Sequence, residues 1–463
     1  MRKIFSILAA AVLLLTGCSQ VQKSGSESPA VIPEAPQEDT VLTIAAMGEL
    51  PEEAARTINA MNEADNGITI VTRDYSGFYE GDAADGYTDD GMRAADFTLI
   101  QDIINTDDID IVTSQSFFDI AKYEILQNKG AFADLYQFME SDPEVNTDTL
   151  NSHVLSLAEK GGKLYTLPAF YGISTLIGRA EYVGSKENWT VDEFISRWEE
   201  MPENSTINYD RTREEAFYTI LRGNISSFID YKNAQVHFDS PEFKRILEFC
   251  SRFEFNNGNK SAYDFDAPNF VGYSIIMGFM CEKGYFSSGE NTLVGFPTYD
   301  GKGSFLTPAN TCWSVSAKSS PEKQQAAWEL IRTFCTEEWL NENVMVYKDY
   351  GTPENSFWNE LPGFSLNDKF CRQLGYDISD GKYYDGLIHG KEGDYYVELP
   401  SHEDIEKLLD YINSTEKWEV KEDSALSLIV REEVFRYFAD EITLDECIEL
   451  IQNRAAIWVS EQQ

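Results

Sequence analysis

Few side chains in this sequence have the type and spacing of a known catalytic centre. The four histidines stand outside the H-E-x-x-H and H-x-H patterns that ligate metal ions. They are His153, His237, His389 and His402. The G-x-S-x-G, P-loop and G-x-G-x-x-G patterns are missing as well. Residues 320–323 match S-x-x-K, but Ser320 precedes a proline at the expected start of a helix, where a serine hydroxyl caps the helix. We therefore expect no catalytic residue, no metal ion and no cofactor.

Carboxylates are the chemically active groups in excess. The 463 residues include 79 Asp and Glu against 37 Lys and Arg, a formal net charge of −42. Such a surface repels nucleic acid and anionic lipid headgroups, because binding them requires basic side chains opposite the phosphates. This excludes nucleic acid as a partner. Glycoside hydrolysis needs only two carboxylates across a cleft, but no pair stands out here. A binding protein is preferred, and a surface glycoside hydrolase stays the least favoured alternative.

The first eighteen residues have the pattern of an export signal. Arg2 and Lys3 precede an unbroken apolar run at 4–15, which is shorter than the roughly 20 residues that cross a bilayer. The small residues before Cys18 resemble the lipobox of bacterial lipoproteins. The resemblance implies that residues 1–17 are a signal peptide, and that a lipid on the Cys18 thiol anchors the protein at the extracytoplasmic face of the cell membrane. An ordinary signal peptide followed by a chance cysteine is the alternative.

The six other cysteines are far apart in the sequence and form no C-x-x-C pair. Export permits disulfides, but the sequence assigns no pairs. Several of these cysteines stand in apolar runs, which suits small buried side chains. We interpret them as free buried thiols. They are Cys250, Cys281, Cys312, Cys335, Cys371 and Cys447.

Residues 18–40 are rich in Ser, Pro, Gln and Glu, and read as a flexible linker. A strand at 41–46, a helix that begins near Pro51 and a strand at 68–71 then form a β-α-β unit, which implies parallel strands. A helix at 97–104, a strand at 109–112 and a helix at 118–126 continue the alternation. The order predicts an α/β fold. Further strands are predicted at 162–168, 293–297 and 313–316, with helices beginning at Ser320 and Thr443.

Several segments resemble motifs of extracellular solute-binding lipoproteins of bacterial ABC importers, in the sugar-binding group called family 1. K-G-A-F-A-D-L at 129–135 resembles the family's G-x-L-x-D-L. G-K-L-Y-T-L-P at 162–168 resembles G-K-x-Y-x-x-P, the strand that leads into the first hinge crossing. G-F-P-T-Y-D-G-K-G at 295–303 resembles the return crossing.

Three more segments bear on the resemblance. S-A-K at 316–318, followed by A-A-W-E-L at 326–330, is similar to I-S-x-x-S-x-x-x-x-A-W-E-F. G-T-P at 351–353 falls where the third crossing is expected. The chain departs from the family at 276–281, where I-M-G-F-M-C replaces the usual G-x-A-A-M strand. The order and spacing of these segments over residues 41–463 carry the resemblance.

The resemblance implies a two-lobed, periplasmic-binding-protein-like α/β fold of type II, with three hinge crossings. Lobe 1 would contain residues 41–168 and 298–350, and lobe 2 residues 169–297 and 351–463. Ligands of open α/β sheets bind at the carboxyl ends of strands, and clefts between domains are favoured sites. We therefore expect the ligand in the cleft between the lobes, with hinge closure around it.

The function that the resemblance implies is that of a substrate-binding subunit. The protein would act as a monomer, capture a sugar or oligosaccharide, and deliver it to the transmembrane permease subunits of an ABC transporter. The same fold with a peptide, a polyamine or another small solute as ligand is the alternative, because an acidic surface tolerates cations.

The predicted ligand contacts follow strands on lobe 1. Glu49 follows the first strand, where it would accept hydrogen bonds from sugar hydroxyls or simply favour the positive end of the next helix. The loop after the strand at 109–112 matches a ligand loop of the family, and capping of a helix by Ser116 is its alternative role. This loop contributes Ser114, Gln115, Ser116 and Phe117.

Aromatic side chains near the crossings are the other candidates, since their flat apolar faces suit sugar rings. Phe170 and Tyr171 lie on the first crossing, with core packing as the alternative. Trp313 holds a position that faces the cleft in the family, and Trp358 lies just past the third crossing. We expect Trp313→Ala to abolish ligand binding and to leave the melting temperature of the unliganded protein nearly unchanged.

Overall fold

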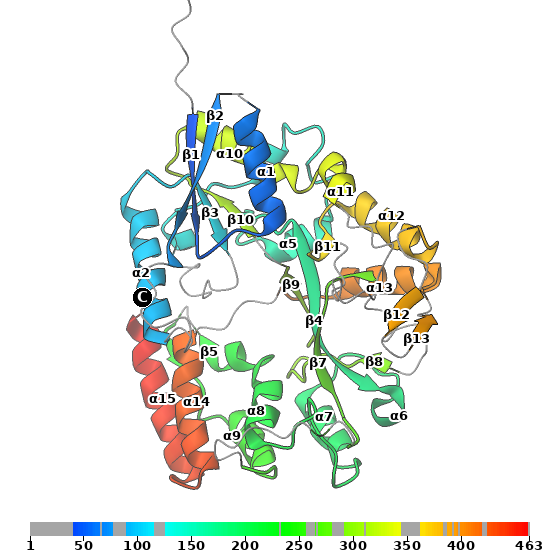
Figure 1. Cartoon of the computed structure of the whole chain (residues 1–463). Coiled ribbons are helices and arrows are strands. Elements are labelled where there is room, and N and C mark those ends of the chain that lie inside the picture. Colours follow the sequence, from blue (N-terminus) through cyan, green and yellow to red (C-terminus); the bar gives the residue numbers. More distant parts are fainter. Residues whose placement is uncertain are drawn as a thin grey trace, which may run out of the picture. The chain divides into compact units, whose positions relative to one another are not determined.

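The first sheet is the α/β core that the sequence predicts. It contains β1 (Thr40–Ala46), β2 (Ile68–Asp74), β3 (Ile111–Ser114) and β10 (Cys312–Val315), in the order β10-β3-β1-β2 (Figure 1). β1 runs parallel to β2 and to β3, and β10 pairs antiparallel with β3. The β-α-β unit is confirmed: α1 (Glu52–Glu63) connects β1 to β2 and buries Ala54 and Ile58. The sequence places Pro51 at the first position of this helix, whereas in the structure Pro51 holds the N-cap position, without a side-chain capping hydrogen bond, and the helix begins at Glu52.

The structure of the chain is a computed structural model. The model describes residues 40–64, 67–76, 89–114, 126–230, 233–255, 264, 267–279, 291–309, 312–343, 362–382, 387–390, 393–396, 399–418 and 424–461. All of them belong to one unit of the chain, which begins at Asp39. Within these ranges, no helix is long and apolar enough to cross a membrane.

The second sheet is built around one long strand, β4 (Phe170–Arg179), which is buried along nearly its whole length. Every other strand of this sheet pairs antiparallel with β4. These strands are β7 (Gly272–Ile276), β8 (Asn291–Leu293), β9 (Phe305–Pro308) and β11 (Phe364–Ser365). Both faces of β4 are covered, and its buried side chains include the polar Ser174 and Thr175.

Two predicted strands differ from the structure. Residues 162–168 form only isolated bridges, at Lys163 and Leu167, and the continuous strand begins at Phe170. The strand predicted at 293–297 is β8, which ends at Leu293. The chain turns at Gly295, which adopts a φ of 73° that side-chain-bearing residues rarely take.

Helices form most of the remaining structure. Between β2 and β4 they are α2 (Asp89–Asn105), α4 (Tyr136–Met139) and α5 (Ser152–Ala158). After β4 come α6 (Ala180–Val183), α7 (Val191–Trp198), α8 (Arg213–Leu221) and α9 (Pro241–Cys250). The last third contains α10 (Pro321–Thr333), α11 (Glu337–Asn343), α12 (Asp368–Ser379), α13 (His402–Ser414), α14 (Ser424–Phe438) and α15 (Leu444–Glu461).

Short elements complete the described chain. They are the 3-10 turn Ile225–Phe228 and the hairpins β5 (Ile229–Asp230) with β6 (Gln235–Val236) and β12 (Leu387–Gly390) with β13 (Gly393–Tyr396). The capping box predicted at the start of the final helix is confirmed: Thr443 Oγ1 accepts from the Glu446 backbone N–H at 3.3 Å, and Glu446 Oε2 accepts from the Thr443 backbone N–H at 2.8 Å.

Buried apolar side chains form two large clusters. Cluster 1 draws its members from residues 42–177, 276–340 and 364–412. Cluster 2 draws its members from residues 176–296 and 426–459. β4 contributes to both, with Ile173 and Ile177 in cluster 1 and Leu176 in cluster 2. β4 therefore packs against both clusters.

The structure describes five of the six cysteines that follow Cys18, and all five are buried thiols outside any disulfide. They are Cys250, Cys312, Cys335, Cys371 and Cys447. Burial raises the pKa of Cys335 to about 12, because the charged thiolate is disfavoured away from water. The interpretation as free buried thiols is confirmed for these five. Cys18 and Cys281 lie outside the described residues.

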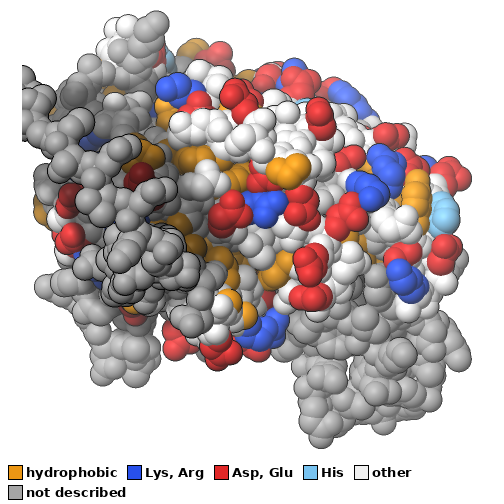
Figure 2. Space-filling model, turned by 90° about the horizontal axis from the view of Figure 1, so that it is seen from above, with side chains coloured by type: hydrophobic (Ala, Val, Ile, Leu, Met, Phe, Trp, Pro, Cys, Tyr) orange, Lys and Arg blue, Asp and Glu red, His pale blue; other side chains and the backbone are white. Residues whose placement is uncertain are grey.

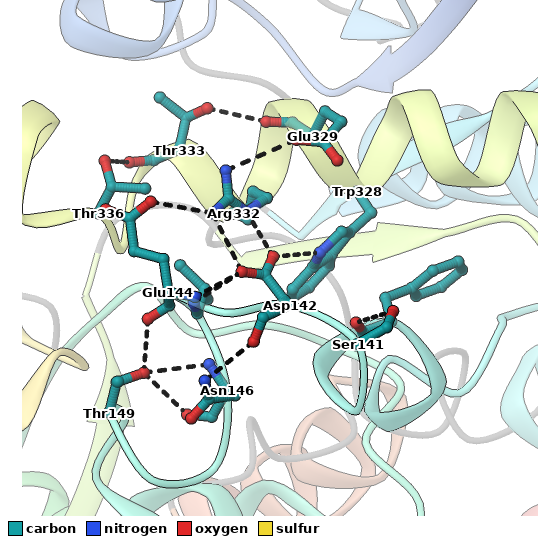
Figure 3. A network of polar contacts seen from close by, with 12 residues as sticks. Ser141, Asp142, Glu144, Asn146, Thr149, Trp328, Glu329, Arg332, Thr333 and Thr336 are labelled. Atoms are coloured by element: carbon teal, nitrogen blue, oxygen red, sulfur yellow. Dashed lines mark hydrogen bonds and ion pairs between the residues drawn. The ribbon is translucent and has the colours of Figure 1, made fainter.

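Asp142 fastens the loop at 141–149 to α10 (Figure 3). Its Oδ2 accepts from Trp328 Nε1 at 2.9 Å and from Arg332 Nε at 2.5 Å, and its Oδ1 accepts from Arg332 Nη2 at 3.0 Å. Burial works to raise the pKa of Asp142, but the hydrogen bonds from Arg332 and from the loop backbone hold it below its usual value. The carboxylate therefore stays charged, and the loop is held against the helix.

A second carboxylate, Asp110, joins the first sheet to the same helix. It is 0% exposed directly before β3. Its Oδ2 accepts from the Thr43 backbone N–H at 2.9 Å and from Lys323 Nζ at 3.0 Å, and its Oδ1 accepts from Ser319 Oγ at 2.6 Å. Ser320 caps α10 by accepting from the Lys323 backbone N–H at 3.4 Å, so the capping role predicted for the S-x-x-K match is confirmed. The lysine of that match neutralises a buried charge.

We expect Lys323→Met to lower the free energy of unfolding by about 3 kcal/mol, because removing one partner of a buried ion pair leaves an uncompensated charge. Urea denaturation followed by circular dichroism measures the change. The control is Glu322→Gln, an exposed residue in the same helical turn, which should change stability by less than about 0.5 kcal/mol. Equal stability of wild type and Lys323→Met would contradict the role of the pair.

Candidate functional site

Three segments that are far apart in the sequence lie side by side at the start of β4. The first, 167–171, pairs with the second, whose described residues are 305–309 and 312–313: Trp313 N donates to Leu167 O at 3.2 Å, Leu167 N donates to Trp313 O at 2.8 Å, and Ala309 N donates to Phe170 O at 3.0 Å. The third segment, 364–366, pairs with the other edge of the first, and its Leu366 N donates to Ala169 O at 2.9 Å. This three-segment junction connects the first sheet to the second.

Gly363 allows the junction to be this narrow. A Cβ atom at this position would lie 2.5 Å from Ala309 Cβ and 2.6 Å from Tyr171 O, which is closer than non-bonded atoms approach. Any side chain here would push the third segment away from the other two. The junction therefore depends on a backbone contact that only glycine permits.

The junction identifies which segments cross between the sheets. The return segment pairs with β4 at 305–308, and it follows the residues at 295–303 that resemble the family's return crossing. The described third segment is 364–366, whereas the predicted third crossing at 351–353 lies outside the described residues. The predicted lobe boundaries stay a prediction. Residues 364–412 contribute to cluster 1 and residues 426–459 to cluster 2.

The first sheet has a topological switch point beside this junction. From β1 the chain passes through α1 to β2 on one side, and later through α2 to β3 on the other side of β1. Ligands of open α/β sheets bind at the carboxyl ends of the strands that flank such a reversal. At this edge, residues 47–50 follow the carboxyl end of β1, and Ser114 is the last residue of β3. Cys312 of β10 pairs with Ser114.

Asp74 fixes the loops at this edge. Its Oδ1 accepts from the Gly48 backbone N–H at 2.8 Å and from the Ser76 backbone N–H at 2.8 Å, and its Oδ2 accepts from Ser76 Oγ at 2.8 Å. Partial burial works to raise the pKa of Asp74, but the hydrogen bonds from Ser76 and Gly48 bring it below its usual value. The loop after β1, which presents Glu49, is thereby tied to the end of β2.

The structure brings some of the predicted contacts to this edge. Glu49 is exposed in the loop after β1, and Ser114 ends β3. Both therefore lie at the carboxyl edge of the first sheet, where the sequence places them. Gln115, Ser116, Phe117 and Trp358 lie outside the described residues. Their contact with a ligand stays a prediction.

The aromatic candidates are packed in cluster 1. Phe170 is 4% exposed and lies 6.1 Å from the Trp339 ring, and Tyr171 is 1% exposed and lies 5.9 Å from the Phe364 ring. Trp313 is 2% exposed, and its indole stacks on Phe334 at 5.0 Å with an interplanar angle of 12°. Phe170 and Tyr171 have the surroundings of core residues, which is the alternative role given for them above. Ligand contact by these three residues stays a prediction.

Residues between 209 and 273 form an aromatic surface that the sequence did not indicate. Arg222 lies 4.3 Å from the Tyr273 ring centre, and its Nη2 donates to Tyr273 Oη at 2.9 Å. Tyr209 is 39% exposed, close to the same strand. We call Tyr209, Arg222 and Tyr273 the aromatic platform. Tyr209 and Tyr273 are more than sixty positions apart in the sequence. No motif contains the three residues, so only folding brings them together.

The backbone beneath the aromatic platform is strained. Asn208 and Tyr209 adopt φ values of 51° and 63°, which are uncommon for residues other than glycine. Asn269 Oδ1 accepts from the Tyr209 backbone N–H at 2.9 Å, and Asn208 Oδ1 accepts from the Tyr273 backbone N–H at 3.1 Å. The segment at 205–208 pairs with residues 268–271, so Tyr209 follows its carboxyl end. Conformations of this kind concentrate at functional sites.

The charge distribution agrees with the composition. Figure 2 shows Asp and Glu side chains spread over the described surface of one face, interspersed with Lys and Arg. Among the described residues, no group of three or more His, Cys, Asp or Glu side chains could hold a metal ion. The groups at the carboxyl edge and on the aromatic platform are hydrogen-bonding and aromatic, which is the chemistry that holds a small polar solute.

No protein-family model matches the chain, and no curated protein matches it. Solved structures match its fold. An extracellular solute-binding protein of family 1 from Alicyclobacillus acidocaldarius is 12% identical with a TM-score of 0.53, over 92% of this chain and 100% of that chain. An ABC-transporter solute-binding protein from Agrobacterium vitis, with bound D-mannitol, is 15% identical with a TM-score of 0.51, over 91% and 99%.

Two further structures share the fold. The sugar-binding protein MalE from Xanthomonas citri is 12% identical with a TM-score of 0.51, over 91% of this chain and 98% of that chain. A de novo designed esterase is 12% identical with a TM-score of 0.54, over 92% and 99%. At such identities the likeness concerns the fold alone. The chain has the two-lobed, periplasmic-binding-protein-like α/β fold, so the predicted fold class is confirmed.

Burial revises the expected effect of Trp313→Ala on stability. Removing a buried, stacked indole should lower the free energy of unfolding by about 3–5 kcal/mol, so the melting temperature of the unliganded protein should fall. Thermal unfolding monitored by circular dichroism measures the change. Trp313→Phe, which keeps a ring against Phe334, should recover most of the loss. An unchanged melting temperature for Trp313→Ala would contradict the packing described here.

Proposed function

We propose that the protein is a lipid-anchored substrate-binding subunit of an ABC transporter. It captures a sugar or oligosaccharide between its lobes and delivers it to the permease subunits. The observation that carries the proposal is the two-lobed fold shared with solute-binding proteins over at least 91% of the chain. The junction of three narrow segments supports it, because lobes joined only by short crossings can close around a ligand by a hinge motion.

An uncharged polyhydroxylated ligand fits the groups at the proposed site. One structure with this fold was solved with bound D-mannitol, and another is described as a sugar-binding protein. In this chain, Glu49 is an exposed carboxylate at the carboxyl edge of the first sheet, and Tyr209 is an exposed aromatic ring of the aromatic platform. Aromatic faces suit the apolar side of a sugar ring, and carboxylates accept hydrogen bonds from its hydroxyls.

The proposal assigns no catalysis to the protein. The esterase that shares the fold is 12% identical and carries no activity over to this chain. A peptide, a polyamine or another small solute in the same cleft is the second candidate, and the excess of acidic side chains favours it for a cationic solute. A surface glycoside hydrolase is the least favoured function.

Ligand screening tests the proposal. We expect the melting temperature to rise with one or more of a panel of monosaccharides, sugar alcohols and maltooligosaccharides, because a ligand that binds only the folded state stabilises it. Small-angle scattering should show compaction with the same ligand. A panel of peptides and polyamines, screened alongside, distinguishes the second candidate. If no soluble nutrient shifts the melting temperature or compacts the protein, the proposal fails.

Glu49 provides a test of the carboxyl edge. Glu49→Ala should weaken binding of the sugar found in the screen by about tenfold or more, because a hydrogen bond to a charged group is worth about 1.5–3 kcal/mol. The melting temperature of the unliganded variant should stay close to that of the wild type, since the side chain is exposed. The matched control is Glu63→Ala, an exposed carboxylate at the far end of α1. Equal dissociation constants in calorimetry for wild type and Glu49→Ala would remove Glu49 from the site.

Cys18→Ser tests the anchor. Without the thiol no lipid can be attached, so we expect the variant to move from the membrane fraction to the soluble extracytoplasmic fraction. Cell fractionation followed by immunoblotting measures the distribution. Cys250→Ser, a substitution at a buried cysteine, should leave the protein in the membrane fraction. Retention of Cys18→Ser at the membrane would contradict lipidation at this position.

A further inference from the structure

The strand β4 contains a buried hydroxyl without a hydrogen-bond partner among the described residues. Ser174 is 0% exposed, and no described group lies within hydrogen-bonding distance of its Oγ. The next residue, Thr175, is equally buried, but its Oγ1 is paired with Ser304 Oγ at 3.0 Å, and Ser304 Oγ is paired in turn with Tyr411 Oη of α13. An unpaired buried hydroxyl destabilises the conformation that contains it. A serine at this place is therefore favourable only in a conformation that pairs its hydroxyl.

Ser174 lies at the point where one edge of β4 changes its partner strand. Near the junction this edge pairs with β9, and Ser174, opposite Phe305, is the last residue of that pairing (Figure 1). Farther along, the edge pairs with β8, beginning at Ile177 opposite Leu293. Under the proposed function, closure turns the strands of the junction against the strands beyond it. The twist of β4 is then expected to change where β9 gives way to β8.

The side chains around Ser174 include one candidate partner. Opposite residues of antiparallel strands share a face, and so do alternate residues of one strand. The face of Ser174 therefore also carries Gly172 and Leu176 of β4, Tyr273 and Ile275 of β7, and Phe305 and Thr307 of β9. Two of these side chains bear a hydroxyl. Tyr273 Oη accepts from Arg222 Nη2 at 2.9 Å, whereas Thr307 lies on the strand next to Ser174, one diagonal step away.

Gly172 leaves the diagonal between the two hydroxyls free of a β4 side chain. It pairs with Thr307, and a Cβ atom at this position would lie 2.9 Å from Ile276 O, so the strand requires glycine here. Diagonal neighbours on one face of a sheet are about 7–8 Å apart, which is too far for a hydrogen bond between short side chains. A change in the twist between two strands shortens one diagonal and lengthens the other. Twisting in one sense therefore brings Ser174 and Thr307 together.

From this geometry we propose that Ser174 Oγ and Thr307 Oγ1 form a hydrogen bond in the closed conformation of the lobes. We call these two residues the hydroxyl pair. A bond made in the closed conformation alone stabilises it relative to the conformation described here, so it tightens the binding of any solute that closes the lobes. Both residues are positioning residues and neither touches the solute. The inference rests on the proposed function, because it requires a solute that closes the lobes.

Thermal unfolding without solute, and calorimetry with D-mannitol and with maltotriose as probes, test the hydroxyl pair on the full chain. Without solute, Ser174→Ala should melt at the wild-type temperature or about 1–2 °C above it, because it removes an unpaired buried hydroxyl. Ser174→Ala and Thr307→Val should each raise the dissociation constant of the probe that the wild type binds by about fivefold. The double variant should raise it no further, since either substitution alone removes the whole hydrogen bond.

Two variants serve as controls. Thr307→Ser keeps the hydroxyl and should bind the probe as tightly as the wild type. Ser205→Ala is the matched control, because Ser205 is 1% exposed and its Oγ also has no hydrogen-bond partner in the described part of the chain, but it lies outside β4 and β9. This variant should melt as Ser174→Ala does and bind the probe as the wild type does.

Each other outcome overturns the hydroxyl pair. A lower melting temperature of Ser174→Ala without solute shows that the hydroxyl already has a partner, such as a buried water molecule. An unchanged dissociation constant for Ser174→Ala, or additive effects in the double variant, contradicts the bond and leaves the proposed function intact. Equal weakening by Ser205→Ala assigns the loss to removal of any buried hydroxyl. If the wild type binds neither probe and no sugar of the screening panel, the proposed function fails, and the hydroxyl pair fails with it.

Discussion

The close approach of three chain segments at the start of β4 is the constraint on which the rest of the structure depends. Gly363 leaves no room for a side chain between Ala309 and Tyr171 O, so the segments contact one another through their backbones. The hydrogen bonds of Trp313 and Leu167 continue this contact into the first sheet. Apolar packing joins the two sheets as well, because cluster 1 contains side chains of both, such as Ile44 of β1 and Ile173 of β4.

Buried carboxylates fix the parts that surround the junction. Asp110 binds the first sheet to α10 through Lys323, and Asp142 binds the loop at 141–149 to the same helix through Arg332. Each buried charge has a cationic partner and further hydrogen-bond donors, which is the condition under which a buried carboxylate is tolerated.

Among the described residues, the candidate groups lie at two places, with Glu49 at the carboxyl edge of the first sheet and Tyr209 and Tyr273 on the aromatic platform. Asp74 is occupied by backbone N–H groups, so its role is to hold the loop that presents Glu49. Arg222 is spread over the Tyr273 ring, which orients the aromatic face. The strained backbone at Asn208 and Tyr209 is compensated by side-chain amides from the same region. Under the proposed function, these groups recognise the shape and the hydroxyl pattern of a sugar, and hinge closure distinguishes the bound form for a permease.

Much of the local structure followed from the sequence by itself. Apolar spacing and capping residues predicted β1, α1, β2, α10 and α15, because these features act within a few residues of one another. The motifs led to the correct fold class, and Glu49 and Ser114 were placed correctly at a sheet edge by their position after strands. Only the tertiary structure decided that Trp313, Phe170 and Tyr171 are packed in a core, that the crossing segments pair at 305–313 and 364–366, and that Tyr209, Arg222 and Tyr273 meet. The physical reason is that burial and long-range pairing depend on which distant segments approach each other, and composition or spacing along the chain carries no measure of that distance.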